Sequence, residues 1–459
     1  MTDSILIIGG GVAGLAAALD CAAAGARSIV VEQDAIVGGR LAAGLTQKSS
    51  VGDSAAGMPI PKLDVVVGQD SIEIITLADV QQIAGRPGNF DVTIRERARF
   101  VTDACTRCNH CKPVCPVVRE NEHDAGLTFR KAIYTPLPET LPQEFVIDID
   151  ACLNSPPNYL PCNRCTEVCD DDAIHFDVAL EREHHRQVGA VIVTAGVGIA
   201  TDSSAKERGY GSHADIVTTA ELERLLTAPG PTGGFAAKPS NEEYVNSILL
   251  VLNELLPRTV HIAASQVERL VEQNVGRIAL LVTALPANTE RERLQQRLPD
   301  GLTVNYGLLQ TVEARADNRI AVKYADLVSS RIPEEHYDMV VLGSDIGPAA
   351  GIDALAQVLG CDLDDAGYVA TPSAEDAGAT SCPGVYAAGG ATGSLVLHDV
   401  IEEARAAAGA ALTYLDPRLL DSSRIGEQGG AALPEATRTT EADLQARFEQ
   451  ALHVLLQES

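Results

Sequence analysis

The chain has 459 residues, with 35 basic and 63 acidic side chains and a formal net charge of −28 at pH 7. This length is enough for about three domain-sized units with buried cores. Because nucleic acids and anionic membranes repel an acidic surface, the charge argues against either as the main partner. The longest apolar runs fall well short of the ~18 residues of a membrane-spanning helix. A strand predicted to start at Ser4 leaves no room for a cleavable signal peptide, so we expect a cytoplasmic protein.

The N-terminal segment has the pattern of a strand, a helix and a second strand. An apolar run at residues 4–8 predicts the first strand, an alanine-rich stretch at 12–24 the helix, and residues 28–32 the second strand. Between the first strand and the helix the sequence reads Gly9-Gly10-Gly11-Val12-Ala13-Gly14, which contains the glycines of GxGxxG. In such a turn the dinucleotide phosphates lie at the helix N-terminus, where unpaired N–H groups favour anions.

The three glycines of this motif have separate tasks. Gly9 allows the tight turn, Gly11 lets the backbone approach a pyrophosphate, and Gly14 lets the helix pack closely on the strand. Glu32, at the end of the next strand, is placed to accept hydrogen bonds from a ribose diol. When such a motif stands alone, a glycine-rich packing turn is the alternative interpretation.

Later segments favour a flavin over that alternative. Gly38-Gly39-Arg40 follows Glu32 at the spacing of flavoproteins with two dinucleotide-binding domains, and Thr194-Ala195-Gly196 resembles their second motif. The run from Thr380 to Gly389 resembles their third motif, which brings a helix N-terminus beneath the isoalloxazine. These flavoproteins usually have Asp next, where this chain has Gly390, so the hydrogen bond to the ribityl chain must come from elsewhere. The predicted FAD-binding residues are Gly9, Gly11, Val12, Ala13, Gly14, Glu32, Gly39, Arg40, Ala195, Gly196, Gly389 and Gly390.

A second α/β unit is predicted over residues 235–347, after a Pro/Gly-rich stretch at 228–234 that is typical of a linker. Its apolar runs at 278–283 and 339–342 predict buried strands. No GxGxxG follows any strand of this unit, and Ala284-Leu285-Pro286-Ala287-Asn288 contains no glycine that would admit a pyrophosphate. A nicotinamide substrate is therefore not predicted.

Two cysteine tetrads lie between Cys105 and Cys169, which is not how disulfides are arranged in a secreted domain. The first, Cys105-x2-Cys108-x2-Cys111-x3-Cys115-Pro116, is the ligand run of a bacterial-type ferredoxin. A structural zinc site would instead be expected to have two CxxC pairs. The second tetrad, Cys152-x9-Cys162-x2-Cys165-x3-Cys169, has a longer first loop and Asp170 where proline is usual.

In two-cluster ferredoxins the fourth cysteine of each run binds the other cluster. We therefore expect two [4Fe–4S] clusters with crossed ligand sets. The first set is Cys105, Cys108, Cys111 and Cys169, and the second is Cys152, Cys162, Cys165 and Cys115.

Short motifs outside the cofactor sites identify a family. They read Arg130-Lys131-Ala132-Ile133-Tyr134, Gly209-Tyr210-Gly211 near Thr218-Thr219-Ala220-Glu221-Leu222, and Gly230-Pro231-Thr232-Gly233-Gly234. With them the chain resembles the A-type subunit of heterodisulfide reductase, from residue 1 to about 234 and from about 338 to 415. The resemblance implies an FAD on a thioredoxin-reductase-like core that exchanges electrons with an inserted ferredoxin domain and with partner subunits. Some members of that family bifurcate electron pairs at the flavin.

The chain departs from this family in places that bear on bifurcation. Family members carry cysteines for a flavin-proximal cluster where this chain reads Asp53-Ser54-Ala55-Ala56-Gly57-Met58. They also tend to have a lysine near the flavin, in a segment that here reads Gly393-Ser394-Leu395-Val396-Leu397-His398. These departures argue against full bifurcation.

The predicted fold class is α/β, with two dinucleotide-binding-like, thioredoxin-reductase-like domains and an inserted bacterial-type ferredoxin domain. The predicted domains are an FAD-binding domain in three parts (1–99, 178–234 and 348–415), the inserted ferredoxin domain (100–177), a second α/β domain without a nucleotide loop (235–347), and a linker with a C-terminal amphipathic helix (416–459).

The predicted function is that of an FAD and iron–sulfur electron-transfer subunit in a heterodisulfide reductase-like complex acting on disulfide, thiol or sulfur substrates. The expected partners are the other subunits of that complex and, by analogy with flavoproteins of this fold, a second copy of the chain in a homodimer. The alternatives are the A-type subunit of a quinone-interacting oxidoreductase of sulfur metabolism, an NAD(P)H-dependent flavoprotein, and a scaffold whose cofactors are structural.

Overall fold

The computed structural model describes residues 4–39, 65–66, 68–137, 141–155, 160–200, 203–228, 230–253, 255–283, 286–299, 302–343, 345–372, 377–393 and 396–415. Arg40, the segment at 53–58 and the predicted C-terminal helix lie outside the described residues. Contacts divide the chain into Met1–Asp416, to which all of these ranges belong, and Pro417–Ser459.

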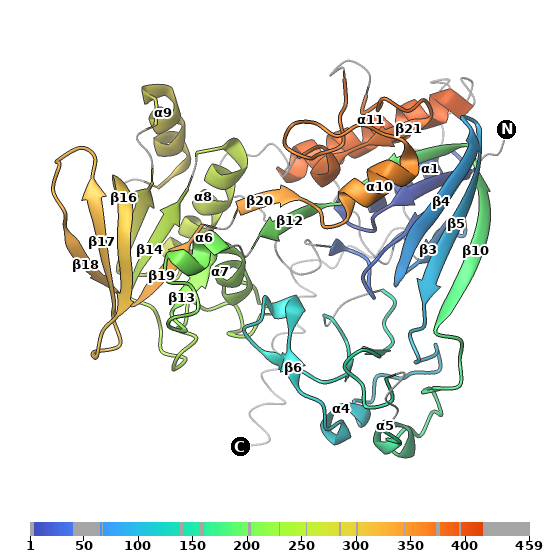
Figure 1. The fold of residues 1–459 in the computed structure, drawn as a ribbon, viewed down its shortest axis with the longest axis horizontal. Helices are drawn as coiled ribbons and strands as arrows, with labels where there is room; N and C mark the ends of the chain where they lie inside the picture. Colours follow the sequence, from blue (N-terminus) through green and yellow to red (C-terminus); the bar gives the residue numbers. More distant parts are fainter. Residues whose placement is uncertain are drawn as a thin grey trace, which may run out of the picture. The chain divides into compact units, whose positions relative to one another are not determined.

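A five-stranded parallel sheet lies at the centre of the first α/β unit, which we call the flavin unit (Figure 1). Its strands, in spatial order, are β21 (Val385–Ala387), β11 (Ala190–Val193), β1 (Ser4–Ile8), β2 (Arg27–Val31) and β3 (Ile72–Ile75). Strand β1 pairs in parallel with β2 on one side and β11 on the other. Its residues Ile5, Leu6 and Ile7 are fully buried, which explains why the strand reads as one apolar run. The predicted strands and the predicted helix between them, α1 (Val12–Ala23), are confirmed.

Helices and a β-meander complete the flavin unit. The helices are α1, α10 (Ile352–Leu359), the 3-10 turn η3 (Gly389–Thr392) and α11 (Leu397–Leu415). The antiparallel meander consists of β4 (Ala78–Arg86), β5 (Asn89–Arg97) and β10 (Glu181–Val188). Ile94 of β5 and Val188 of β10 are buried with Leu6 of β1 in one core, so the meander packs on the parallel sheet.

The cysteine-rich segment is inserted between two paired strands. Strand β5 ends at Arg97, β10 begins at Glu181, and these two residues are partners in the antiparallel ladder. We call residues 98–180 the insert. The chain leaves the sheet before the insert and returns to it after the insert at paired positions, so the insert does not interrupt the pairing of β5 with β10 (Figure 1). The elements of the insert are short: α4 (Cys111–Val114), β6 (Arg119–Glu120), η2 (Glu122–Asp124), β7 (Phe129–Arg130), β8 (Ile133–Tyr134), β9 (Val146–Ile147) and α5 (Arg164–Glu167).

A seven-stranded mixed sheet forms the second α/β unit (Figure 1). In spatial order its strands are β13 (Ile216–Thr218), β19 (Met339–Leu342), β14 (Ser247–Leu252), β15 (Arg277–Val282), β16 (Thr303–Ala314), β17 (Ile320–Asp326) and β18 (Glu334–Tyr337). Its helices are α6 (Ser203–Glu207), α7 (Thr219–Leu225), α8 (Pro257–Glu272) and α9 (Asn288–Arg297). The chain enters this unit through β12 (Val197–Ala200) and returns through β20 (Asp345–Pro348), which pair antiparallel.

The sheet topology moves one predicted boundary. Strand β13 pairs with β19, so the seven-stranded sheet already includes residues that we assigned to the FAD-binding domain up to residue 234. The passage between the two sheets occurs earlier, at β12, and a three-residue strand such as β13 leaves little trace in a sequence pattern. Within the predicted linker, residues 230–234 form a turn packed on the end of α7, where Thr232 Oγ1 donates to Leu225 O at 2.6 Å.

No helix among the described residues is long and apolar enough to cross a membrane.

Candidate functional site

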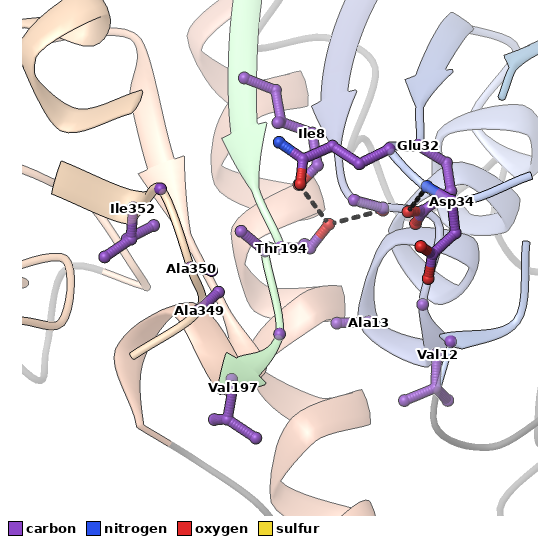
Figure 2. Close-up of a pocket in the computed structure, with 18 of the residues that line it drawn as sticks. Ile8, Val12, Ala13, Glu32, Asp34, Thr194, Val197, Ala349, Ala350 and Ile352 are labelled. Carbon is purple, nitrogen blue, oxygen red and sulfur yellow. Dashed lines mark hydrogen bonds between the residues drawn. The ribbon is translucent and has the colours of Figure 1, made fainter. Parts of the chain in front are cut away.

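A cavity of about 700 Å³ opens at the carboxyl ends of β1, β2 and β11 (Figure 2). This is the edge at which parallel α/β sheets bind ligands, and the volume is in the range of small-molecule sites. Among the residues that we predicted to bind FAD, those that line the cavity are Gly9, Gly11, Val12, Ala13, Glu32, Gly39, Ala195, Gly196 and Gly390. Gly14 and Gly389 lie outside its lining, and Arg40 lies outside the described residues.

The glycine turn between β1 and α1 is fixed by close backbone packing. Gly9 has a positive φ of +113°, and a Cβ there would lie 2.5 Å from the Thr194 carbonyl oxygen. A Cβ at Gly14 would lie 1.9 Å from the Gly9 carbonyl oxygen, which explains why Gly14 packs rather than lines the cavity. Thr194 Oγ1 ties the turn to β11 by donating to Ile8 O at 3.1 Å and Gly9 O at 2.9 Å (Figure 2).

The N-terminus of α1 is open to the cavity. Gly11 caps the helix, and, apart from its chain neighbours, the described residues place no heavy atom within 4 Å of where its Cβ would be. Val12 and Ala13 follow it along the cavity wall. The first backbone N–H groups of a helix have no intrahelical partner, and the helix dipole favours negative charge at this end. This part of the cavity therefore fits a pyrophosphate group.

Glu32 stands on the wall beside this turn (Figure 2). Its Oε2 accepts a hydrogen bond from Gly10 N at 2.7 Å, and its Oε1 accepts one from Asp34 N at 2.8 Å. Burial raises the pKa of Glu32 to about 7, against the opposing effect of these backbone donors. A carboxylate has about four acceptor positions, so this one retains capacity for the hydroxyl groups of a ribose.

The third flavin motif approaches the second more closely than a side chain would permit. A Cβ at Gly390 would lie 2.6 Å from the carbonyl carbon of Gly196. The usual Asp therefore does not fit at this position in this chain. The N–H of Gly389 donates to Glu403 Oε2 on α11 at 2.8 Å, which explains why Gly389 faces the helix rather than the cavity.

Other parts of the chain add walls to this cavity that were not predicted from the sequence. The insert contributes Glu122, His123 and Leu137, the second unit contributes Glu223, His261, Ile262 and Ser265, and the segment entering α10 contributes Ala349, Ala350, Gly351 and Ile352. Ala349, Ala350 and Ile352 lie on the opposite side of the cavity from Glu32 (Figure 2). The segments that add these walls contain no motif that would have predicted them. The nearest signal is Arg130-Lys131-Ala132-Ile133-Tyr134, which lies shortly after Glu122 and His123.

A second, smaller cavity is lined by cysteines from both tetrads. Cys115 of the first run and Cys152, Cys162 and Cys165 of the second line it together with apolar residues that include Ile133 and Ile147. This is the crossed set that the sequence predicts for the second cluster. Burial, together with the neighbouring Cys152 and Cys115, raises the pKa of the Cys165 thiol to about 11. Thiolates so placed fit a positively charged iron centre, which would offset that cost.

The other four cysteines of the two tetrads are brought together less completely. Burial, together with the nearby Cys105 and Cys108, raises the pKa of Cys111 to about 12. Cys169 packs in the same apolar cluster, where its Sγ accepts from Ala173 N at 3.3 Å. Within the described ranges, no three His, Cys, Asp or Glu side chains stand close enough to share a single metal ion. A [4Fe–4S] cluster does not require three protein ligands at one metal ion, because each thiolate binds a different iron atom of the cluster.

In the second unit, the loop at the corresponding edge of the sheet lacks the features of a pyrophosphate-binding turn. After β14 the chain continues through Asn253 to Leu256, and α8 begins at Pro257. This proline at the first helical position has no N–H, and the loop carries none of the glycines that would bring the backbone to a pyrophosphate.

Comparison with known proteins gives three kinds of similarity. A family model described as an FAD binding domain matches residues 4–47. The A subunit of the H(2):CoB-CoM heterodisulfide,ferredoxin reductase of Methanothermobacter marburgensis is 30% identical over 437 residues, covering 88% of this chain and 63% of that protein. The second of two iron-sulfur A subunits of the CoB–CoM heterodisulfide reductase of Methanopyrus kandleri is 32% identical over 434 residues, covering 90% and 65%. The chain thus spans less than two-thirds of the length of these relatives.

Among solved structures, thioredoxin reductase from T. acidophilum is similar, with a TM-score of 0.47 and 15% identity over 89% of this chain and 97% of that one. The sequence relatives confirm the resemblance drawn from the short motifs, and the family-model match supports FAD binding in the N-terminal segment.

Proposed function

Because the chain is a homologue of the A-type subunit of heterodisulfide reductase, we propose that it is the FAD and iron–sulfur electron-transfer subunit of a heterodisulfide reductase-like oxidoreductase complex. In this proposal the cavity that contains Glu32 holds FAD, and the eight cysteines of the insert hold two [4Fe–4S] clusters. The bound FAD exchanges two electrons, and the clusters carry electrons singly.

The observation that carries this proposal is the position of the β8–β9 ribbon. Residues on its two faces alternate, as they do in any β-strand. Ile133 and Ile147 face the cavity that Cys115, Cys152, Cys162 and Cys165 line. On the other face, Tyr134 and Val146 pack against Ala35, which follows Glu32 and Asp34 in the flavin unit. A single two-stranded ribbon therefore lies between the flavin unit and the second cluster site, so the second cluster is the one whose surroundings contact the flavin unit directly.

The chain's own residues position the cofactors and shield them. The α1 N-terminus and Glu32 hold the dinucleotide end of FAD by hydrogen bonds and charge. The apolar residues around the cysteines, including Ile133 and Phe145, keep water from the second cluster, and burial of this kind tunes cluster potentials. We place the chemistry on a disulfide, thiol or sulfur substrate on partner subunits, and we propose a homodimer of this chain within the complex.

An anaerobic redox titration of the purified protein tests this function. Flavin is followed by absorbance and the clusters by EPR, and we expect one FAD and two [4Fe–4S] signals that can be reduced and reoxidised. Stopped-flow mixing of the fully reduced protein with an excess of a one-electron acceptor, which takes electrons through the clusters, then compares the rate of flavin oxidation in the wild type with that in two variants. Cys162→Ser should remove the second cluster and slow electron transfer from the flavin, whereas Cys108→Ser should remove the first cluster and leave that step fast.

Two results would contradict the proposal. Clusters that neither reduce nor reoxidise would make the cofactors structural. Rapid bleaching of the flavin by NADH would instead favour an NAD(P)H-dependent flavoprotein.

A further inference from the structure

Arg130 lies between the two cavities, and its side chain is only 5% exposed. Its Nε donates to Glu122 Oε2 at 2.6 Å, and its Nη2 donates to Asp148 Oδ2 at 2.8 Å. The guanidinium lies over the ring of Tyr134, 3.9 Å from the ring centroid. One buried cation therefore joins two carboxylates that come from different segments of the insert.

The Glu122 end of this network reaches the FAD cavity. Glu122 and His123 form part of the turn η2, and both line the cavity together with residues of the glycine turn. The His123 ring packs against Tyr134, with 5.7 Å between ring centroids, so the aromatic ring under Arg130 also supports His123.

The Asp148 end reaches the second cluster site. Asp148 Oδ1 accepts from Ala151 N at 3.2 Å, and its backbone oxygen accepts from Cys152 N at 3.0 Å. Asp148 N in turn donates to Ala132 O at 2.8 Å, and Ala132 lines the cysteine cavity. Asp148 therefore fixes the backbone conformation of the turn that carries Cys152.

We propose that Arg130 is a positioning residue that couples the two sites, holding Glu122 and His123 against FAD while it holds Asp148 and the Cys152 turn in place for the second cluster. This inference rests on the proposed function, because it takes FAD and a cluster as the occupants of the two cavities. Coupling between sites is reciprocal, so cluster assembly strengthens FAD binding by the factor with which FAD stabilises the cluster site.

The experiment measures the FAD dissociation constant of anaerobically purified, deflavinated protein by titration with FAD. Four proteins form a double-mutant cycle: wild type, Cys162→Ser, Arg130→Gln, and both substitutions together. In the Arg130-containing pair, loss of the second cluster should weaken FAD binding by about tenfold, within the range of coupling between sites. In the Arg130→Gln pair, the same loss should leave the dissociation constant unchanged.

Arg119→Gln is the matched control. Arg119 also donates to Asp148 Oδ2, at 2.6 Å, but its side chain is 45% exposed and lies outside the walls of both cavities. The variant should keep the tenfold effect of Cys162→Ser. Arg130→Lys retains the charge without the planar fork that bridges two carboxylates, so it should lose most of the coupling even if Arg130→Gln does not fold.

A second readout separates coupling from simple support of the fold. The midpoint potential of the second cluster, followed by EPR, should shift when FAD is removed from the wild type and should stay constant when FAD is removed from the Arg130→Lys variant. The inference is overturned if Cys162→Ser weakens FAD binding equally with and without Arg130, or if Arg119→Gln abolishes the coupling as well. Failure of the proposed function shows earlier, as wild-type protein that binds no FAD or no iron.

Discussion

Gly390 faces the backbone of Gly196 so closely that a Cβ at residue 390 would lie 2.6 Å from the Gly196 carbonyl carbon and 2.8 Å from its Cα. The second and third flavin motifs thus meet through bare backbone at the cavity wall, where both glycines line the proposed FAD site. Backbone atoms cannot move aside as a flexible side chain does, so the contact ties the geometry of β11 to that of η3.

Gly390→Ala should therefore destabilise the protein and weaken FAD binding. Overpacking of this kind costs about 1–3 kcal/mol, and the backbone shift would displace the cavity wall. Gly409→Ala in α11 is the control, because outside the helix's own nearby backbone the described residues place no heavy atom within 4 Å of that Cβ, and alanine favours the helix by roughly 1 kcal/mol. Urea unfolding and FAD titration measure both variants. An equal gain in stability at the two positions would refute the close contact.

FAD binding should tighten as pH rises to about 7. Burial raises the pKa of Glu32 to about 7 in the FAD-free protein, so the carboxyl is protonated below that pH. Ribose hydroxyls donate to the ionised carboxylate, so binding below pH 7 must release a proton. The dissociation constant should rise by up to about tenfold for each pH unit below 7 and level off above it.

Glu32→Gln provides the control for this pH dependence. The amide does not titrate, so its FAD affinity should be constant across the range in which Glu32, with its pKa of about 7, changes charge. Asp34→Asn keeps the backbone N–H that donates to Glu32 Oε1 but removes the nearby charge that helps to raise the pKa of Glu32, so its profile should keep the wild-type shape and shift to lower pH. A profile that persists in Glu32→Gln would assign the titration to another group.

Cys115→Ser should remove the second cluster rather than the first. Cys115 belongs to the first run in the sequence, but it lines the cavity with Cys152, Cys162 and Cys165. Iron content should fall by about half, and the EPR signal lost should be the one that Cys162→Ser also removes. Cys382→Ser, outside both tetrads, should leave both signals. Loss of the signal that depends on Cys108 would instead mean that each run binds its own cluster.

Local chemistry explains what could be predicted from the sequence. The β1–α1–β2 segment was predictable because apolar runs, alanines and glycines act within a few residues of one another. The crossed position of Cys115 followed from ferredoxin spacing, and the structure places this residue in the cavity with three cysteines of the second run. The sequence also showed that Gly390 replaces the usual Asp, but it did not show the reason, which is the close approach of the Gly196 backbone.

Long-range packing explains what could not be predicted. Glu122 and His123 line the cavity of the flavin unit, where Arg130 donates to Glu122 and the Tyr134 ring packs on His123, and no local sequence pattern predicts these contacts. The segment 228–234 has the composition of a linker, yet its residues 230–234 pack on α7, where Thr232 donates to Leu225. The composition of a segment indicates which backbone turns it can adopt, but not which residues it packs against.

The buried ion pair between Asp124 and Arg224 should make a large contribution to stability. Arg224 Nη2 donates to Asp124 Oδ1 at 2.7 Å, with the Arg224 and Asp124 side chains 1% and 15% exposed, and the pair joins η2 of the insert to α7 of the second unit. Removing Arg224 leaves the Asp124 carboxylate without its cation, while Asn121 and Thr128 still donate to its Oδ2. Arg224→Met should therefore lower the free energy of unfolding by about 3 kcal/mol, the lower end of the range for breaking a buried ion pair.

An exposed ion pair provides the comparison. Lys323 Nζ and Glu334 Oε2 are 3.2 Å apart, with side chains 41% and 36% exposed, so Lys323→Ala should cost less than about 1 kcal/mol. Chemical unfolding of both variants in the deflavinated protein gives the two free energies. If Arg224→Met costs no more than Lys323→Ala, the contact between the insert and α7 does not depend on this pair, and its stability must come from apolar packing instead.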